Sequence, residues 1–175
     1  MTELQQRLTA SIRDIADFPR AGVGFKDITP LLGDAALLRA TVDALAAPLA
    51  DAGITKVLGV EARGFILATP VAVVLGAGFV PVRKVGKLPW EVASQEYALE
   101  YGTDILEIHR DAVTPGERVV IVDDVLATGG TAAATVRLVE ALGAEVVGLS
   151  FLLELSLLGG RAAVPGYAVT SLLAY

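Results

Sequence analysis

The sequence VVIVDDVLATGGT, residues 119–131, contains the pattern that decides the fold. Its branched apolar residues predict a buried strand, and two adjacent carboxylates, Asp123 and Asp124, follow directly. Next come Gly129 and Gly130, which favour a turn, and then a stretch with helical period. A buried strand that passes through a glycine turn into a helix is typical of a parallel sheet covered by helices.

The same alternation of strand and helix extends along most of the chain. The expected helices are 4–15, 35–53, 64–75 and 131–144, and the expected strands are 57–61, 79–84, 96–102, 103–110, 118–124 and 145–155. Residues 18–32 read as a loop in which Pro30 begins a short helix with Thr29 as its N-cap. We therefore predict an α/β fold: a mostly parallel twisted sheet flanked by helices on both faces, in a single domain over 1–175.

The composition excludes several classes of protein and site. The 175 residues include 14 Lys and Arg against 20 Asp and Glu, and this net charge of -6 argues against a nucleic-acid-binding surface. The chain has no cysteine, so disulfides and thiolate metal sites are excluded. A histidine-rich metal centre is not expected, because His109 is the one histidine, and it reads as a strand residue with its hydrogen bonds satisfied.

An uncharged stretch over 64–82 has the length of a membrane span. It contains Pro70 and Pro81, and the Gly-Ala-Gly sequence at 76–78 divides it. We therefore interpret it as a buried helix, a turn and a short strand. Since the first residues are polar and unlike a signal peptide, we expect a soluble, cytoplasmic protein with no membrane segment.

The predicted sheet places several charged residues at one edge. Ligands of parallel sheets bind beyond the carboxyl ends of the strands. Here those ends carry Glu61, Lys84, Asp123 and Glu154. The sequence therefore predicts a single crevice with these four side chains around it.

The glycine turn in that crevice is suited to a phosphate. Its glycines let backbone N–H groups converge, Thr128 and Thr131 add hydroxyl donors, and the N-terminus of the following helix points at the same place. Asp123 and Asp124 would repel a phosphate, but they can accept hydrogen bonds from a sugar diol or bind Mg²⁺. A ribose 5-phosphate carries both a phosphate and a diol, one sugar apart.

Two other interpretations of this segment are weaker. A Walker B strand also ends in carboxylates, but it requires a G-x-x-x-x-G-K-[ST] loop elsewhere. The Gly86-Lys87 pair is followed by Leu88, and Pro81 stands at the position of the first glycine. A plain buried strand with a polar end is the other alternative, and the glycine turn beside the carboxylates argues against it.

Residues 119–131 resemble the phosphoribosyl-pyrophosphate motif of the type I phosphoribosyltransferases. The resemblance implies that Asp123 and Asp124 hold the 2′- and 3′-hydroxyls of the ribose. It implies that the turn holds the 5-phosphate through Ala127, Thr128, Gly129, Gly130 and Thr131. It also implies the fold of that family, in which segments from both ends of the chain form a small hood over the base.

Four further segments resemble the members of this family that act on adenine. Residues 18–32 are similar to the base-covering segment, 61–66 to the pyrophosphate loop, 82–102 to the catalytic loop and 151–161 to the segment that closes over the base. Three positions depart from the family pattern: RGFILA replaces an RGFIFG-like run, Glu61 an aspartate, and Lys26 an arginine. None of these departures removes a chemical group that the reaction needs.

The resemblance assigns the chemistry of the reaction to particular residues. The cations expected to neutralise the leaving pyrophosphate are Arg63, Arg83, Lys84 and Lys87. Glu100 is expected to accept the proton that the purine loses, so the catalytic residues would be Glu100, Lys84 and Arg63. Residues at about 85–99 would form a mobile lid that Glu100 follows. Mg²⁺ is the expected cofactor, held mainly through substrate and water.

Adenine is expected to be read in part by the backbone. It offers an acceptor at N1 and a donor amine at C6, so a peptide N–H and a peptide C=O from Gly24 and Lys26 can bind it. Phe25 and Leu155 would then sandwich the ring. A 6-oxopurine reverses this donor and acceptor pattern and would leave backbone groups unpaired.

The resemblance thus predicts an enzyme of purine salvage, working as a homodimer. It would transfer the 5-phosphoribosyl group from phosphoribosyl pyrophosphate to adenine, giving AMP and pyrophosphate. One alternative is a xanthine or 6-oxopurine phosphoribosyltransferase, against which the 18–32 segment argues. Another is a non-catalytic regulator that senses phosphoribosyl pyrophosphate, which would carry a DNA-binding domain and a basic face; this chain is acidic.

Overall fold

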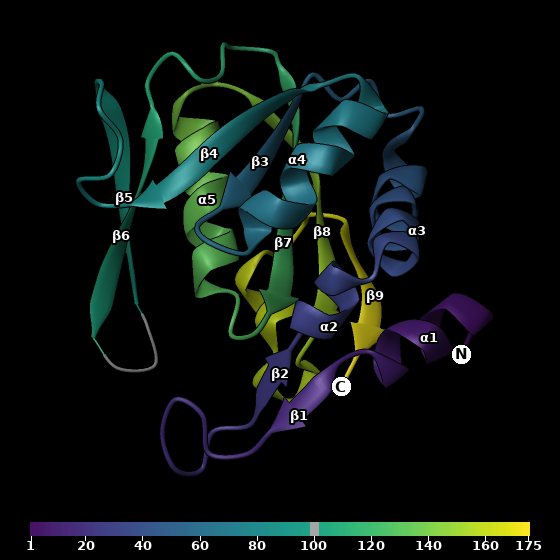
Figure 1. Ribbon diagram of the computed structural model, residues 1–175. Helices are drawn as coiled ribbons and strands as arrows, with labels where there is room; N and C mark the ends of the chain where they lie inside the picture. The colour runs from purple at the N-terminus through teal and green to yellow at the C-terminus, as the bar shows by residue number, and fades with distance from the viewer. Residues whose placement is uncertain (99–101) are drawn as a thin grey trace. The chain divides into compact units, whose positions relative to one another are not determined.

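The computed structural model of the protein describes residues 1–98 and 102–175 (Figure 1). By its internal contacts the chain divides into two compact units, Met1–Ala44 and Leu45–Tyr175. The single domain expected over 1–175 stays a prediction.

The first unit begins with α1 (Glu3–Ala10) and a two-stranded antiparallel sheet of β1 (Arg13–Ile15) and β2 (Phe25–Asp27). Thr2 closes a capping box at the start of α1: its Oγ accepts the Gln5 N–H at 3.2 Å, and Gln5 Oε1 accepts its N–H at 2.8 Å. The helix expected over 4–15 is therefore too long. Its last residues pair across β1 and β2 instead, where opposite charges face each other, Arg13 with Asp27 and Asp14 with Lys26.

The next helices, α2 (Thr29–Gly33) and α3 (Ala35–Ala46), differ from the prediction at their ends. The prediction of Thr29 as an N-cap is wrong: Ile28 is the cap position, and the Thr29 N–H donates to Asp27 Oδ1 at 2.9 Å. The helix expected over 35–53 ends at Ala46 and continues as a 3-10 turn, η1 (Ala47–Leu49). Pro48 explains the break, because it has no N–H to donate to the preceding turn.

The second unit contains a seven-stranded sheet with the order β5-β6-β4-β3-β7-β8-β9. The strands are β3 (Lys56–Val60), β4 (Gly78–Lys84), β5 (Val92–Ala98), β6 (Thr103–His109), β7 (Arg118–Leu126), β8 (Glu145–Glu154) and β9 (Val169–Ala174). In this order the neighbouring strands from β4 through β3, β7 and β8 to β9 are parallel. Strand β6 pairs antiparallel with both of its neighbours, β4 and β5. The mostly parallel sheet is confirmed, although β9 was not predicted.

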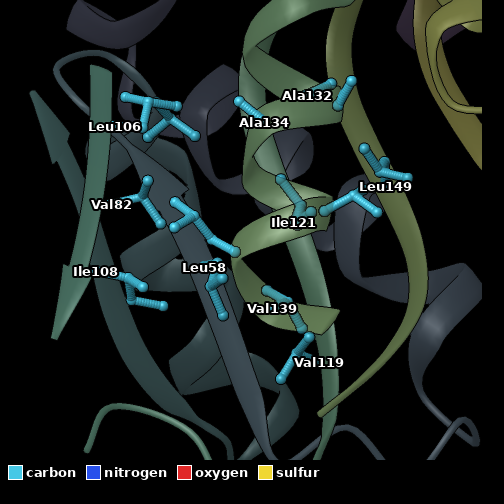
Figure 2. Close-up of a cluster of buried hydrophobic side chains, with 14 of the residues drawn as sticks. Leu58, Val82, Leu106, Ile108, Val119, Ile121, Ala132, Ala134, Val139 and Leu149 are labelled. Atoms are coloured by element: carbon cyan, nitrogen blue, oxygen red, sulfur yellow. The ribbon is translucent and has the colours of Figure 1, made fainter. Parts of the chain in front are cut away.

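Helices α4 (Gly64–Leu75) and α5 (Gly130–Ala141) pack on opposite faces of this sheet (Figure 1). Side chains alternate along a strand, so Leu58 and Ile121 face α5 in one buried cluster, which Figure 2 shows. The next residue, Gly59, faces α4: a Cβ there would lie 2.8 Å from the Cβ of Ala68. Each fully buried aliphatic side chain contributes about 1.5–3 kcal/mol, and this packing fixes β7 against α5.

Two further sequence expectations change in the second unit. The hairpin arm expected over 96–102 is the earlier strand β5, so much of the lid predicted over about 85–99 is a strand paired with β6. His109 lies in β6 as expected, but its Nε2 is buried and has no hydrogen-bond partner among the described residues. Its prediction as a satisfied residue is wrong for that atom.

The uncharged stretch over 64–82 forms α4, a turn at Gly76 with a φ of 65°, and β4, as expected. Within residues 1–98 and 102–175, no helix combines the length and the apolar character that crossing a membrane requires.

Candidate active site

The turn between β7 and α5 lines an open pocket with about 300 Å³ of empty space. Its walls are Asp123, the run from Val125 to Ala132, and Phe151 of the neighbouring strand β8. Gly129 precedes α5 with a φ of 83°, a left-handed conformation that favours glycine. The structure thus brings together all the residues predicted for the 5-phosphate, from Ala127 to Thr131.

The N-terminus of α5 lies in this pocket. The Ala133 N–H donates to the Gly129 carbonyl at 2.9 Å and forms the first turn of the helix. The N–H groups of the preceding residues have no partner within the helix, and the cap position supplies no side-chain acceptor. Free N–H groups at the positive end of a helix favour an anion, so the pocket is suited to a phosphate.

A second glycine segment lies directly behind the turn. It belongs to η3 (Gly160–Ala163), which follows the short 3-10 turn η2 (Ser156–Leu158). A Cβ on Gly160 would lie 2.3 Å from the carbonyl oxygen of Ala127, and a Cβ on Gly129 would lie 2.3 Å from the carbonyl oxygen of Gly160. The two backbones therefore touch, and sequence reasoning missed this contact although the Gly159-Gly160 pair was visible.

Asp123 lines the pocket, while Asp124 is buried at 6% exposure. Asp123 Oδ1 accepts the Asp124 N–H at 2.9 Å and lies so close to α4 that a Cβ on Gly64 would be 2.6 Å from it. Burial, and secondly the charge of Asp124, raise the pKa of Asp123 well above its usual value of 3.8. A ligand that donates hydrogen bonds or brings positive charge would favour its ionised form.

Arg63, which precedes α4, forms an ion pair with Asp124. The Arg63 Nε donates to Asp124 Oδ2, and the Arg63 side chain is 42% exposed. The peptide bond between Glu61 and Ala62, just before it, is cis. The structure thus connects one predicted pyrophosphate cation to a predicted diol carboxylate.

The other predicted cations gather around Glu61. Its carboxylate pairs with Arg83 at 3.2 Å and with Lys87, and it accepts the Lys84 N–H at 3.3 Å. The hydrogen bond from Lys87 is the main cause that lowers the pKa of Glu61 from its ordinary value. These contacts place the end of β3 and the loop after β4 at one edge of the sheet.

The ammonium of Lys84 has a different partner, Asp104 of β6, at 2.8 Å. This pairing raises the pKa of Lys84 and lowers that of Asp104. Buried Glu107, also in β6, accepts the Gly86 N–H at 2.9 Å in the loop after β4. Sequence reasoning missed both acidic residues. They stand three positions apart in a strand and so fit no alternating pattern, and only the pairing of β6 with β4 shows their partners.

The remaining predicted site residues that the structure describes do not line this pocket, although the Leu155 N–H donates to the carbonyl of the lining residue Leu126 at 2.9 Å. Glu100 lies in 99–101, outside the described residues. Phe25 and Lys26 lie in β2 of the first unit, where the Phe25 ring meets Phe18 edge-on at 5.0 Å and Lys26 pairs with Asp14. Gly24 precedes that strand, and Leu155 follows β8 in the second unit. Their roles stay predictions.

Glu154 ends β8, as the predicted crevice requires, but its carboxylate is engaged by Arg161. Both Glu154 oxygens accept from the Arg161 Nε at 2.9 Å, and Oε2 also accepts from Nη2 at 2.7 Å. Ser171 Oγ of β9 donates to the same oxygen at 3.1 Å. The hydrogen bond from Arg161 is the main cause that lowers the pKa of Glu154 from 4.5.

This pairing predicts a loss of stability in acid. A carboxyl group whose pKa is lowered by folding stabilises the protein above its unfolded pKa, and this contribution is lost as pH falls through the folded pKa. We therefore expect the difference in unfolding free energy between the wild type and Glu154→Gln to shrink as pH falls from about 5 to about 3. Urea unfolding across this range measures it. A difference that is constant with pH would show that the Glu154 charge is not stabilising.

Two properties of the described residues bear on a metal. No group of three or more carboxylate and imidazole side chains is placed to hold an ion within residues 1–98 and 102–175. Asp123 and Asp124 are adjacent carboxylates beside the pocket. This donor set fits an ion that is held chiefly by substrate oxygens and water, as Mg²⁺ commonly is.

Comparisons with known proteins agree with this geometry. The phosphoribosyl transferase domain family matches residues 34–156. An adenine phosphoribosyltransferase of Acidothermus cellulolyticus is 56% identical over 171 residues, which cover 98% of this chain and 97% of that protein.

Two solved structures are also similar. The adenine phosphoribosyltransferase of Rhodothermus marinus has a TM-score of 0.95 and 53% identity, covering 98% of each chain. The enzyme of Saccharomyces cerevisiae, complexed with an imino-altritol bisphosphate and adenine, has a TM-score of 0.93 and 39% identity, covering 98% of this chain and 99% of that one. A match of the domain family over most of the chain, with relatives of this identity along nearly its full length, shows that the chain belongs to the phosphoribosyltransferase family, among the adenine phosphoribosyltransferases.

Proposed function

We propose that this protein transfers the 5-phosphoribosyl group from phosphoribosyl pyrophosphate to adenine, giving AMP and pyrophosphate. The observation that carries the proposal is the pocket in which Asp123 and the N-terminus of α5 meet across one turn. A 5-phosphorylated ribose offers an anion for the helix terminus and a diol for the carboxylates. The family of the chain fixes the reaction class that such a pocket serves.

The substrate would be divided among three groups of residues. The turn from Ala127 to Thr131 holds the 5-phosphate, and Asp123 and Asp124 hold the ribose hydroxyls. The pyrophosphate lies near the cations at the end of β3 and β4, which are Arg63, Arg83, Lys84 and Lys87. Positive side chains beside the leaving group stabilise the charge that develops as the bond to the ribose breaks.

The cofactor of the proposed reaction is Mg²⁺. When bound to the diphosphate, the ion supplies further positive charge at the leaving group. Asp123 and Asp124 would orient the diol, and the ion pair with Arg63 orients Asp124 before the substrate binds. The protein therefore contributes orientation and charge, while most ligands of the ion would be substrate oxygens and water.

The base and the proton transfer involve residues outside this pocket. Gly24 and Lys26 would present backbone groups to N1 and the C6 amine of adenine, with Phe25 and Leu155 on the two faces of the ring. Glu100 would accept the proton that adenine loses as its ring nitrogen attacks C1. A base covered by a hood of both terminal segments is part of the same proposal.

We also propose a cytoplasmic homodimer. Support for the dimer comes from exposed apolar side chains on α4, where Ile66 is 44%, Val73 76% and Val74 46% exposed. Trp90, in the loop after β4, is 68% exposed. Apolar side chains gathered on one helix commonly mark a protein interface.

The test is pyrophosphate release from phosphoribosyl pyrophosphate and Mg²⁺ with adenine, hypoxanthine, guanine or xanthine supplied separately. We expect adenine to be preferred, because each unpaired backbone group around an oxopurine costs about 1–3 kcal/mol, roughly ten- to a hundredfold in rate. A reaction without base measures background hydrolysis.

Each other outcome favours a different function. Turnover with an oxopurine would keep the ribose site and contradict the base contacts of Gly24 and Lys26. Binding of phosphoribosyl pyrophosphate without turnover on any base would identify a sensor rather than an enzyme.

A further inference from the structure

Several hydrogen bonds hold η3, the segment behind the turn of residues 127–131 (the phosphate turn). Arg161 in η3 donates to both oxygens of Glu154, and its Nη1 donates to the Val169 carbonyl at 2.7 Å. Glu154 is buried at 7% exposure, and Ser171 donates to it as well. One guanidinium thus connects η3 to the carboxyl end of β8 and to the start of β9.

The residue next to Arg161 touches the phosphate turn. Gly160 lies so close to Ala127 and Gly129 that a single methyl group at either glycine would overlap a carbonyl oxygen. Ala163, at the other end of η3, would lie 2.6 Å from a Cβ on Gly129. A shift of η3 would therefore remove the close contacts that hold the backbone of the turn in its position.

Among the described residues, few side-chain hydrogen bonds fix the turn itself. Its residues are small, Gly129 is in a left-handed conformation, and the cap of α5 makes no side-chain hydrogen bond. A phosphate bound by backbone N–H groups requires these groups to converge before the ligand arrives, because ordering them on binding would cost affinity.

We propose that Arg161 is a positioning residue for the 5-phosphate: by its hold on Glu154 it keeps Gly160 against the turn and so keeps the N–H groups of the turn converged. The inference rests on the proposed function, because it takes the turn as the phosphate site. It assigns to Glu154 and Arg161 an effect on the phosphate, although neither lines the pocket.

The chain offers a matched control at the opposite ends of the same strands. Arg118, the first residue of β7, donates through Nη1 to both oxygens of Glu145 at 2.7 and 2.6 Å. Its Nε donates to the Ala52 carbonyl at 2.9 Å. Arg118→Met therefore removes an arginine–glutamate pair and one backbone bond far along β7 from the turn, at a glutamate that is 55% exposed.

The experiment measures ribose 5-phosphate affinity by calorimetry and the KM values for both substrates, in the wild type, Arg161→Met and Arg118→Met. We expect Arg161→Met to weaken ribose 5-phosphate about 10- to 100-fold, the usual effect of losing a residue that orients a binding group. The KM for phosphoribosyl pyrophosphate should rise with it, and the KM for adenine should not. Arg118→Met should leave all three values unchanged.

A double variant separates positioning from stability. Arg161→Met alone leaves a buried carboxylate unpaired, which lowers stability. Glu154→Gln combined with Arg161→Met removes that charge, so the melting temperature should recover while ribose 5-phosphate affinity stays low. The proposal would be overturned if the double variant recovered both the melting temperature and the ribose 5-phosphate affinity. Wild-type affinity in Arg161→Met would overturn it as well.

Failure of the proposed function has a different signature. In that case the wild type would bind ribose 5-phosphate without turning over adenine. Arg161→Met would still bind ribose 5-phosphate more weakly than the wild type, and Arg118→Met would not. A wild type that does not bind ribose 5-phosphate would overturn the positioning role itself.

Discussion

Replacing Gly129 with alanine should lower kcat/KM for phosphoribosyl pyrophosphate by about a hundredfold or more, because a displacement of about 1 Å at a binding group has such an effect. The new Cβ would lie 2.3 Å from the Gly160 carbonyl oxygen and 2.6 Å from the Ala163 Cβ, so the turn must move. The left-handed backbone adds about 1–2 kcal/mol and the overlap about 1–3 kcal/mol of destabilisation. Steady-state kinetics and urea unfolding measure the two effects.

Gly116→Ala is the control for this change. Gly116 precedes β7 with a φ of 84°, and an added Cβ would have no heavy atom within 4 Å. Its substitution should cost the backbone strain alone, about 1–2 kcal/mol, and leave the kinetics unchanged. Equal losses of kcat/KM in the two variants would contradict the role of the turn.

Asp124→Asn is expected to weaken phosphoribosyl pyrophosphate by about 1.5–3 kcal/mol, roughly ten- to a hundredfold in the dissociation constant. The substitution removes a charged acceptor for the ribose hydroxyls and the ion pair with Arg63. The residue is buried at 6% exposure, so water replaces the lost interaction poorly. Titration calorimetry with phosphoribosyl pyrophosphate provides the value.

Two further measurements make this result specific. Ribose 5-phosphate lacks the pyrophosphate, so its affinity should fall as well if Asp124 holds the diol, whereas an effect through Arg63 alone would spare it. Asp43→Asn makes the same chemical change in the exposed ion pair with Arg39 and should leave both affinities unchanged. Unchanged affinity in Asp124→Asn would contradict the diol role.

The glycine turn of residues 127–131 and the two carboxylates were predictable because they are adjacent in the sequence. A strand, a turn and a helix that follow each other within 119–131 form one local unit, and the structure confirms each part. The partners of the cations were not predictable in this way. Asp104 meets Lys84 because β6 pairs with β4, a register that strand order decides and periodicity does not.

The prediction was wrong at the end of α1 and missed β9 because local interactions outweighed the hydrophobic periodicity of the sequence. Residues 13–15 continue the apolar spacing of α1, yet cross-strand charge pairs with β2 make them a strand. The last strand, β9, begins with Val169, Thr170 and Ser171, a mixture too polar to read as buried. It is recognisable only from its pairing with β8, where Ser171 Oγ donates a hydrogen bond to Glu154.

The pairing of the cations with carboxylates has a consequence for ionic strength. Arg63, Arg83, Lys84 and Lys87 each have an acidic partner within the protein, which are Asp124, Glu61, Asp104 and Glu61 respectively. A polyanionic substrate that binds these cations would therefore replace carboxylates of the chain rather than anions from the solution. Because released counterions set the salt dependence of binding, its affinity should vary less with salt than that of a ligand entering a site of unpaired cations.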